Sequence, residues 1–341
     1  MNIKLPLKRL KFPLIVAGIF SIYSCQPEED LSLESSEMVT QQDSAELRKG
    51  NGTRTAVYVS GFQQIIPNHF IKMTLNDGFS SLYYIAEDFN ETQGGNYVLD
   101  YVDAGGTGMD AYPNITIGSS KASGTYYVSD PEAVGMPVQI QDIPATMNFV
   151  FETSQANALD AEDKWMASIN FIFDSYGTAD SEPDNSLRDY DLVVMHESHN
   201  FNDSIEDNPK IETTERLTYW YFARNADLSI KPYVIRYKGK DYTYAVRYKF
   251  FANQGSKDEK VHVKFIPYGP NGTPPLVRVN IKDIVAASKS YYQYANLPQA
   301  ERDLADAKVA KPEAWIKSIN LGYEVYKGDS QLRIDKFKVN L

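Results

Sequence analysis

Residues 315–339 read Trp-Ile-Lys-Ser-Ile-Asn-Leu-Gly-Tyr-Glu-Val-Tyr-Lys-Gly-Asp-Ser-Gln-Leu-Arg-Ile-Asp-Lys-Phe-Lys-Val, and this stretch carries the strongest structural signal in the chain. Apolar or aromatic side chains recur at every second position from Ile319 to Val325. This period of two is typical of a half-buried β-strand, so we predict strands at 316–325 and 331–339. Gly328 and Asp329 lie between them and indicate a turn.

The same kind of pattern recurs upstream, in many short segments rich in β-branched and aromatic residues and separated by Gly, Asn and Asp. Such spacing predicts an all-β fold, a sandwich or jelly roll of two packed antiparallel sheets. The further strands are predicted at 55–62, 81–85, 97–102, 115–117, 124–128, 146–153, 165–173, 191–195, 216–223, 233–237, 240–251 and 261–267.

Helical patterns occur late and are few. Residues 279–292 carry apolar residues at helical spacing, and residues 298–310 begin with a proline and mix acids with bases. Helices so placed exclude an alternating α/β architecture. We therefore predict one or two short helices beside the sheets.

The composition of the chain excludes several classes of function and site. The 341 residues include 45 acids and 34 bases, so the formal net charge is −11. Nucleic acid is excluded as the main partner, because a phosphate backbone is bound through a positive surface. Aromatic residues make up 13% of the chain, which excludes global disorder. A single cysteine excludes both an intrachain disulfide and a metal cage of several thiolates.

The first 24 residues have the features of a targeting signal. Basic residues precede an apolar run at 12–23 that is too short for an ordinary membrane span. The run ends Ile22-Tyr23-Ser24-Cys25, which resembles a bacterial lipobox and predicts lipid attachment at Cys25. A plain secretory signal and a short membrane anchor are the alternatives. Removal of the segment's four positive charges changes the net charge from −11 to −15.

The next segment, 25–54, is acidic and rich in Ser and Gln, and we predict a disordered tether there. Its Pro27-Glu28-Glu29-Asp30 resembles the export signal of surface-exposed lipoproteins, although a solvated linker has the same composition. We expect an extracytoplasmic protein, lipid-anchored to the outer membrane and displayed at the cell surface. One jelly-roll domain is predicted at 55–341.

Several motifs of this domain, taken in order, resemble glycoside hydrolase family 12, the endoglucanases and xyloglucanases. Gly322-Tyr323-Glu324-Val325-Tyr326, with a helix before it and a last strand after it, resembles the end of that family. The stretches 111–118 and 136–144 and the strand pair 165–173 and 190–195 resemble motifs of its middle. The resemblance covers roughly 80–341 and implies a concanavalin-like jelly roll.

The resemblance also implies the catalytic residues. Glu324 matches the family's general acid/base, and Asp191 occupies the position of its nucleophilic glutamate. A retaining glycosidase holds two carboxyl groups about 5–5.5 Å apart, and an inverting one about 6.5–9.5 Å apart. Aspartate is one methylene shorter than glutamate, so Asp191 could activate water instead of attacking the sugar, or could be inert.

Other positions depart from the family's pattern. Met195 replaces its tryptophan at the end of the nucleophile strand, and Asn170, or Asp174 in a shifted register, falls at its second carboxylate. The sugar-stacking tryptophans of the N-terminal part are absent, and Tyr101 could stack instead. Trp220 lies in an aromatic run whose exposed members could form a sugar platform, with core positions as the alternative.

Two stretches next to the predicted catalytic residues complete the expected site. His196 could line the cleft, and Tyr323 adjoins Glu324. The spacing of His196-Glu197-Ser198-His199 is not that of a zinc protease, and Glu197 could act as a relocated carboxylate. We predict neither a metal ion nor a cofactor.

We therefore predict an endo-acting glycoside hydrolase of a β-linked polysaccharide, similar to β-glucan or xyloglucan, that works as a monomer. A non-catalytic surface glycan-binding lipoprotein on the same fold is the alternative. A structural surface lipoprotein without a glycan ligand is a third reading.

Overall fold

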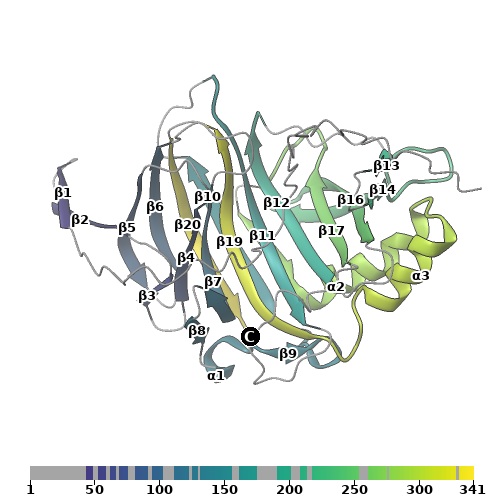
Figure 1. The fold of residues 1–341 in the computed structure, drawn as a ribbon, viewed down its shortest axis with the longest axis horizontal. Coiled ribbons are helices and arrows are strands. Elements are labelled where there is room, and N and C mark those ends of the chain that lie inside the picture. The colour runs from purple at the N-terminus through teal and green to yellow at the C-terminus, as the bar shows by residue number, and fades with distance from the viewer. Residues whose placement is uncertain are drawn as a thin grey trace, which may run out of the picture.

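The chain forms two β-sheets packed face to face, and its two longer helices lie together at one end (Figure 1). This is the predicted jelly-roll sandwich. The computed structural model describes residues 44–48, 53–58, 62–66, 69–75, 81–90, 94–102, 111–122, 125–129, 131–155, 161–174, 190–200, 208–212, 217–252, 260–274, 276–327 and 330–341. The predicted signal peptide and Cys25 lie outside these residues.

The smaller sheet contains seven of the described strands. Their spatial order is β1 (Ser44–Arg48), β2 (Thr53–Tyr58), β5 (Ser81–Asn90), β6 (Gly94–Val102), β20 (Ser330–Asn340), β10 (Asn148–Gln155) and β18 (Val277–Asn280). All of these neighbours pair antiparallel. The strand β1 lies within the predicted tether, so ordered structure begins earlier in the sequence than we expected.

The larger sheet contains thirteen of the described strands. Its main order is β13 (Asn208–Glu212), β14 (Leu217–Phe222), β16 (Lys240–Ala252), β17 (Lys260–Pro267), β12 (Tyr190–His199), β11 (Lys164–Asp174), β19 (Trp315–Lys327), β7 (Ala111–Ala122), β4 (His69–Leu75) and β3 (Phe62–Ile66). Three short or lateral strands join it: β15 (Pro232–Tyr237) on β16, β8 (Thr125–Val128) on β7 and β9 (Val138–Gln139) on β19. Only β12 and β17 pair parallel among these described strands.

The apolar core lies between the two sheets. Phe149 of β10 contacts Phe337 of β20 at 5.0 Å between ring centroids and Phe171 of β11, in the other sheet, at 6.2 Å. Alternate residues of β19 point into this core, among them Leu321 and Tyr323. Their neighbours in the strand therefore point to the opposite side of the large sheet, which we call the outer face.

The two strands of the C-terminal stretch 315–339 belong to different sheets. The strand β19 lies in the middle of the large sheet, whereas β20 lies in the small one. The turn predicted at Gly328 and Asp329 lies outside the described residues. Local sequence predicts a reversal of the chain but does not specify which sheet receives each strand.

The two predicted helices are present with shorter bounds. Helix α2 (Ile281–Ser290) continues into the 3-10 turn η3 (Tyr291–Tyr294), and α3 (Gln299–Lys308) follows. The side chain of Asn280 accepts a hydrogen bond from the Asp283 amide at 3.0 Å and so caps α2. A further single-turn helix, α1 (Pro131–Val134), was not predicted. Within the described part of the chain, no helix has the length and hydropathy needed to cross a membrane.

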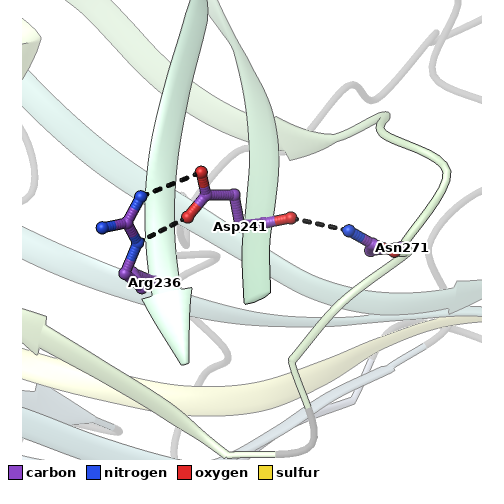
Figure 2. A network of polar contacts seen from close by, with 3 residues as sticks. All are labelled: Arg236, Asp241 and Asn271. Carbon is purple, nitrogen blue, oxygen red and sulfur yellow. Dashed lines mark hydrogen bonds and ion pairs between the residues drawn. The ribbon is translucent and has the colours of Figure 1, made fainter. Parts of the chain in front are cut away.

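The connection between β15 and β16 shows how a turn predicted from sequence is held. Lys238 and Gly239 both adopt positive φ, 47° and 79°, as a tight two-residue hairpin requires. The Arg236 guanidinium makes two hydrogen bonds, of 2.7 and 3.1 Å, to the Asp241 carboxylate across the hairpin (Figure 2). The Asn271 amide donates to the Asp241 carbonyl at 2.8 Å. The hairpin is therefore tied to the loop that follows β17.

One glycine of β7 is required by close packing. Gly118 has φ +101°, and a Cβ at this position would lie 2.2 Å from the carbonyl oxygen of Lys317 in β19. Its amide donates to the Ser129 hydroxyl at 2.9 Å. Both the backbone conformation and the space exclude a larger residue here.

We expect Gly118→Ala to lower the free energy of unfolding by about 3 kcal/mol, since it combines an unfavourable φ with a backbone clash. Gly239→Ala is the matched control, because this turn glycine also has positive φ but meets no atom within 4 Å. We expect it to cost about 1 kcal/mol. Urea denaturation of both variants checks this, and equal losses would show that the clash with β19 is unimportant.

Candidate functional site

The predicted general acid, Glu324, lies on the outer face of the large sheet. Its neighbours Tyr323 and Val325 point into the core, so the carboxylate points to the other side. Glu324 is only 4% exposed. The Tyr326 hydroxyl, two residues further on the same face, donates to Glu324 Oε2 at 2.7 Å. The carboxylate is therefore held in one position by its own strand.

The register of the strands gives the surroundings of Glu324. It lies opposite Met166 of β11, and Met166 lies opposite Ser198 of β12. Met166 belongs to a buried apolar cluster on the outer face with Met195, Phe222, Ala245 and Ile266, against which Trp220 and Ile230 pack. Predicted site residues Met195 and Trp220 thus lie on the same face as Glu324.

Asp191 shares this face but lies far from Glu324. Asp191 is opposite Ile172, whereas Glu324 is opposite Met166, six residues away along β11. At about 3.3 Å per residue this separates them by about 20 Å along the strands, and the strand between them adds about 10 Å across the sheet. Neither a retaining nor an inverting pair spans such a distance. The predicted pairing of these two carboxylates was wrong.

The directions of the paired strands explain this separation. Strands β12 and β19 both run antiparallel to β11, so they run parallel to each other. Asp191 is the second residue of β12, whereas Glu324 lies near the end of β19. Carboxylates at opposite ends of parallel strands lie at opposite ends of a sheet. Asp174, the alternative in a shifted register, is two residues beyond Ile172 and lies near Asp191 rather than near Glu324.

Paired residues form rows across the outer face, and two rows pass through Asp191 and Asn170. The first row contains Ser318, Ile172, Asp191, His262, Lys249 and Trp220. The second row contains Asn320, Asn170, Val193, Lys264, Arg247 and Phe222. The guanidinium carbon of Arg247 lies 5.9 Å from the ring centroid of the half-buried Trp220. These rows place the predicted residues Asn170 and Trp220 on the face that carries Glu324.

Buried polar atoms mark the outer face beside Glu324. Within the described part of the chain, the Ser168 hydroxyl and the Asn320 amide oxygen are buried and have no hydrogen-bond partner. Ser168 pairs with Gly322, two residues before Glu324, and Asn320 lies two residues further back. Buried polar groups are almost always hydrogen-bonded in native proteins, so these two atoms on one face are candidate contacts for a polar ligand.

Three predicted site residues lie elsewhere. Tyr323 is fully buried in the inter-sheet core, where its ring meets Trp165 at 5.6 Å. His196 also points into the core, with its ring 5.0 Å from Phe151 of the small sheet. Tyr101 belongs to β6 of the small sheet, paired with Leu82 and Ser330, so it is not on the sheet that carries Glu324.

The position of His196 follows from the alternation of its strand. Met195 points outward, so the next residue, His196, points into the core. The pairing then passes from Ser168↔Met195 to Ala167↔Glu197, which makes His196 the extra residue of a β-bulge. Glu197, which we had considered as a relocated carboxylate, pairs with the core residue Ala167 and therefore lies on the inner face, away from Glu324.

The described residues were also searched for side chains that could bind a metal ion together. Among the described residues, no three His, Cys, Asp or Glu side chains come together in a way that could hold a metal ion. The outer face carries the carboxylates of Glu324 and Asp191 together with amides, hydroxyls, cations and an aromatic ring.

Comparison with known proteins identifies the fold. No protein-family model matches the sequence, and no curated protein matches it. Among solved structures, the native family 12 xyloglucanase from Bacillus licheniformis superposes with a TM-score of 0.53 at 13% identity, covering 84% of this chain and 99% of that one. The same enzyme in complex with a ligand gives a TM-score of 0.53 over 85% of this chain. The chain has the fold of family 12 glycoside hydrolases.

Burial of His196 predicts a pH effect on stability. Desolvation lowers the pKa of His196 from 6.5 to about 4, because the core disfavours the charged ring. The unfolded chain binds a proton near pH 6.5 and the folded chain does not until about pH 4, so stability falls as the pH falls through this window.

We expect the variant His196→Leu to lack this loss of stability at low pH, because leucine binds no proton. Between about pH 7.5 and about pH 5 its stability relative to the parent protein should rise by about 2 kcal/mol. Urea denaturation at both pH values measures the difference. If the difference in stability between His196→Leu and the parent protein were the same at both pH values, the imidazole of His196 would not be buried in its neutral form.

Proposed function

We propose that the protein binds a polysaccharide along the outer face of the large sheet. The observation that carries this proposal is the pair of buried polar atoms, Ser168 Oγ and Asn320 Oδ1, beside Glu324. Sugars carry hydroxyl groups that both donate and accept hydrogen bonds, so such a ligand would satisfy both atoms. The fold shared with a xyloglucanase supports the class of ligand.

The rest of the face suits the same ligand. Trp220 presents a half-buried ring, and aromatic rings pack against the C–H faces of sugars. Asn170 adds an amide between Asn320 and Val193. Apolar side chains around Met195 fill the floor between these polar groups. A row of amides and hydroxyls next to an aromatic ring is the usual composition of a site for an uncharged polar ligand.

A second function, endo-acting hydrolysis of a β-linked polysaccharide, is favoured by one observation. Glu324 is buried on the outer face, and the Tyr326 hydroxyl donates a hydrogen bond of 2.7 Å to its carboxylate. In this alternative Glu324 would protonate the leaving oxygen, and the second carboxyl group would be one other than Asp191. The fold shared with a xyloglucanase supports this class of reaction.

We also propose that the chain is a lipoprotein anchored to the outer membrane through Cys25 and displayed outside the cell. The basic and apolar segments before Ile22-Tyr23-Ser24-Cys25 support this. The acidic residues that follow would keep the domain away from an anionic membrane surface. A domain placed in this way would meet polysaccharides outside the cell as a monomer.

Binding without cleavage is tested with purified domain and neutral glucans. We expect retarded migration in gels that contain xyloglucan or mixed-linkage β-glucan, and no new reducing ends. Trp220→Ala should weaken binding by about tenfold, because one stacking contact is lost. Tyr294→Ala is the control, since this exposed ring belongs to η3 rather than to the outer face.

Release of reducing ends by the parent protein would favour the hydrolase instead. In that case Glu324→Gln should abolish release while the variant still binds. Asp191→Asn should retain activity, because Asp191 lies at the other end of the sheet. Loss of activity in Asp191→Asn alone would contradict the assignment by register.

The anchor is tested by Cys25→Ser in the full chain. We expect the parent protein in the membrane fraction and the variant in the soluble fraction, because one thiol carries the lipid. Incorporation of labelled fatty acid into the parent protein only is the direct readout. Labelling of both proteins would place the lipid elsewhere and overturn the proposal.

A further inference from the structure

The loop between β14 and β15 is held in shape by its own hydrogen bonds. The amide of Leu228 donates to the Asn225 carbonyl at 3.0 Å, and the amide of Asn225 donates to the Ser229 carbonyl at 2.8 Å. The Asp227 carboxylate accepts hydrogen bonds from the amide of Ser229, at 3.0 Å, and from its hydroxyl, at 2.5 Å. The tip of this loop, 225–229, is therefore a preformed turn.

Leu228, at the tip of this loop, is not explained by stability. Its φ is +67°, a conformation that leucine adopts at a cost and that glycine or asparagine adopts more readily. The side chain is also 73% exposed to solvent. Single exposed apolar residues are common, but here the exposure is combined with a strained backbone that the hydrogen bonds of the loop maintain. Backbone strain of this kind is concentrated at functional sites and ligand contacts.

The loop lies on the side of the large sheet that forms the outer face. Phe222 belongs to the apolar cluster of that face, and Arg224, two residues further along the chain, points to the same side. Arg224 and Ile230 form an isolated β-bridge, and Ile230 packs against the same cluster. The Arg224 guanidinium donates to the Leu228 carbonyl at 2.9 Å. The tip of the loop is therefore at the edge of the outer face.

An apolar floor connects this edge with the polar atoms of the proposed site. The cluster around Met195 begins opposite Ser168 and extends to Ile230 of the loop. The strands β12, β17 and β16 lie between β11, which carries Ser168, and the loop. Four strand spacings of about 4.8 Å place the loop about 19 Å from Ser168. A chain of several sugars that runs across the strands reaches both places, whereas a single sugar does not.

We propose that Leu228 is a contact residue for the polysaccharide, at the edge of the outer face. This inference rests on the proposed function and extends it: the bound chain runs across the strands, from Ser168 to the loop that carries Leu228. There the leucine packs against the C–H groups of a sugar, which removes apolar surface from water. Because the loop is already in shape, little conformational entropy is lost on binding.

The experiment measures stability and binding of Leu228→Asn in the whole purified protein. Asparagine tolerates positive φ, so we expect the urea midpoint of this variant to lie above that of the parent protein. Its binding to xyloglucan in affinity gels should be about fivefold weaker, because apolar contact area is lost. Leu228→Met keeps an apolar side chain of similar volume and should bind xyloglucan as the parent protein does.

Lys238→Asn is the matched control. Lys238 is also an exposed turn residue with positive φ, 47°, but it lies in the hairpin at the other end of β15. We expect this variant to raise the urea midpoint as well and to leave xyloglucan binding unchanged. A gain in stability together with a loss of binding is thus specific to Leu228.

The outcomes separate this inference from the proposed function. If Leu228→Asn binds xyloglucan as tightly as the parent protein while Trp220→Ala binds it more weakly, the contact at Leu228 is overturned and the polysaccharide site stands. A urea midpoint of Leu228→Asn below that of the parent protein would give the leucine a structural role and overturn the inference too. Absence of binding by the parent protein to every glucan would overturn both proposals.

Discussion

The apolar core between the two sheets is the contact on which the rest of the molecule depends. The central strands β11, β12 and β19 of the large sheet bury every second side chain in the core that contains Phe149 and Phe337. The remaining side chains of those strands are thereby assigned to the outer face. Glu324, Asn320 and Ser318 point outward because Leu321 and Tyr323 must point inward. The candidate site thus consists of the residues that alternate along each strand with the core residues.

Departures from regular pairing decide which side chains meet on that face. The bulge in β12 places both His196 and Glu197 opposite Ala167, so Ser198 rather than Glu197 takes the outward position opposite Met166. Gly118 permits β7 to approach the backbone of β19 closely. Such local irregularities do not change the architecture, but they determine the level at which each polar residue is placed.

A shared fold leaves the chemistry of the site open. This chain has the fold of a family 12 xyloglucanase, yet its outer face combines one carboxylate near Met166 with a cluster of cations some distance along the sheet. The cations lie at the end of the sheet where Asp191 was expected to act. Function in such a fold depends on the outer-face residues, because the inner ones are committed to packing.

Local pattern in the sequence was enough to predict the fold class, most of the strands and both main helices. These depend on periodicity, which a strand or helix carries in its own residues. Strands β1, β3, β4, β9, β13 and β18 escaped prediction, and Tyr323 and His196 were misplaced.

The folded structure was needed to show that Asp191 and Glu324 lie far apart, that Tyr101 belongs to the other sheet, and that Arg247, Lys249 and Lys264 share one face with Trp220. These relations depend on strand order and register. Both are set by contacts between segments far apart in the chain, and no local pattern encodes them.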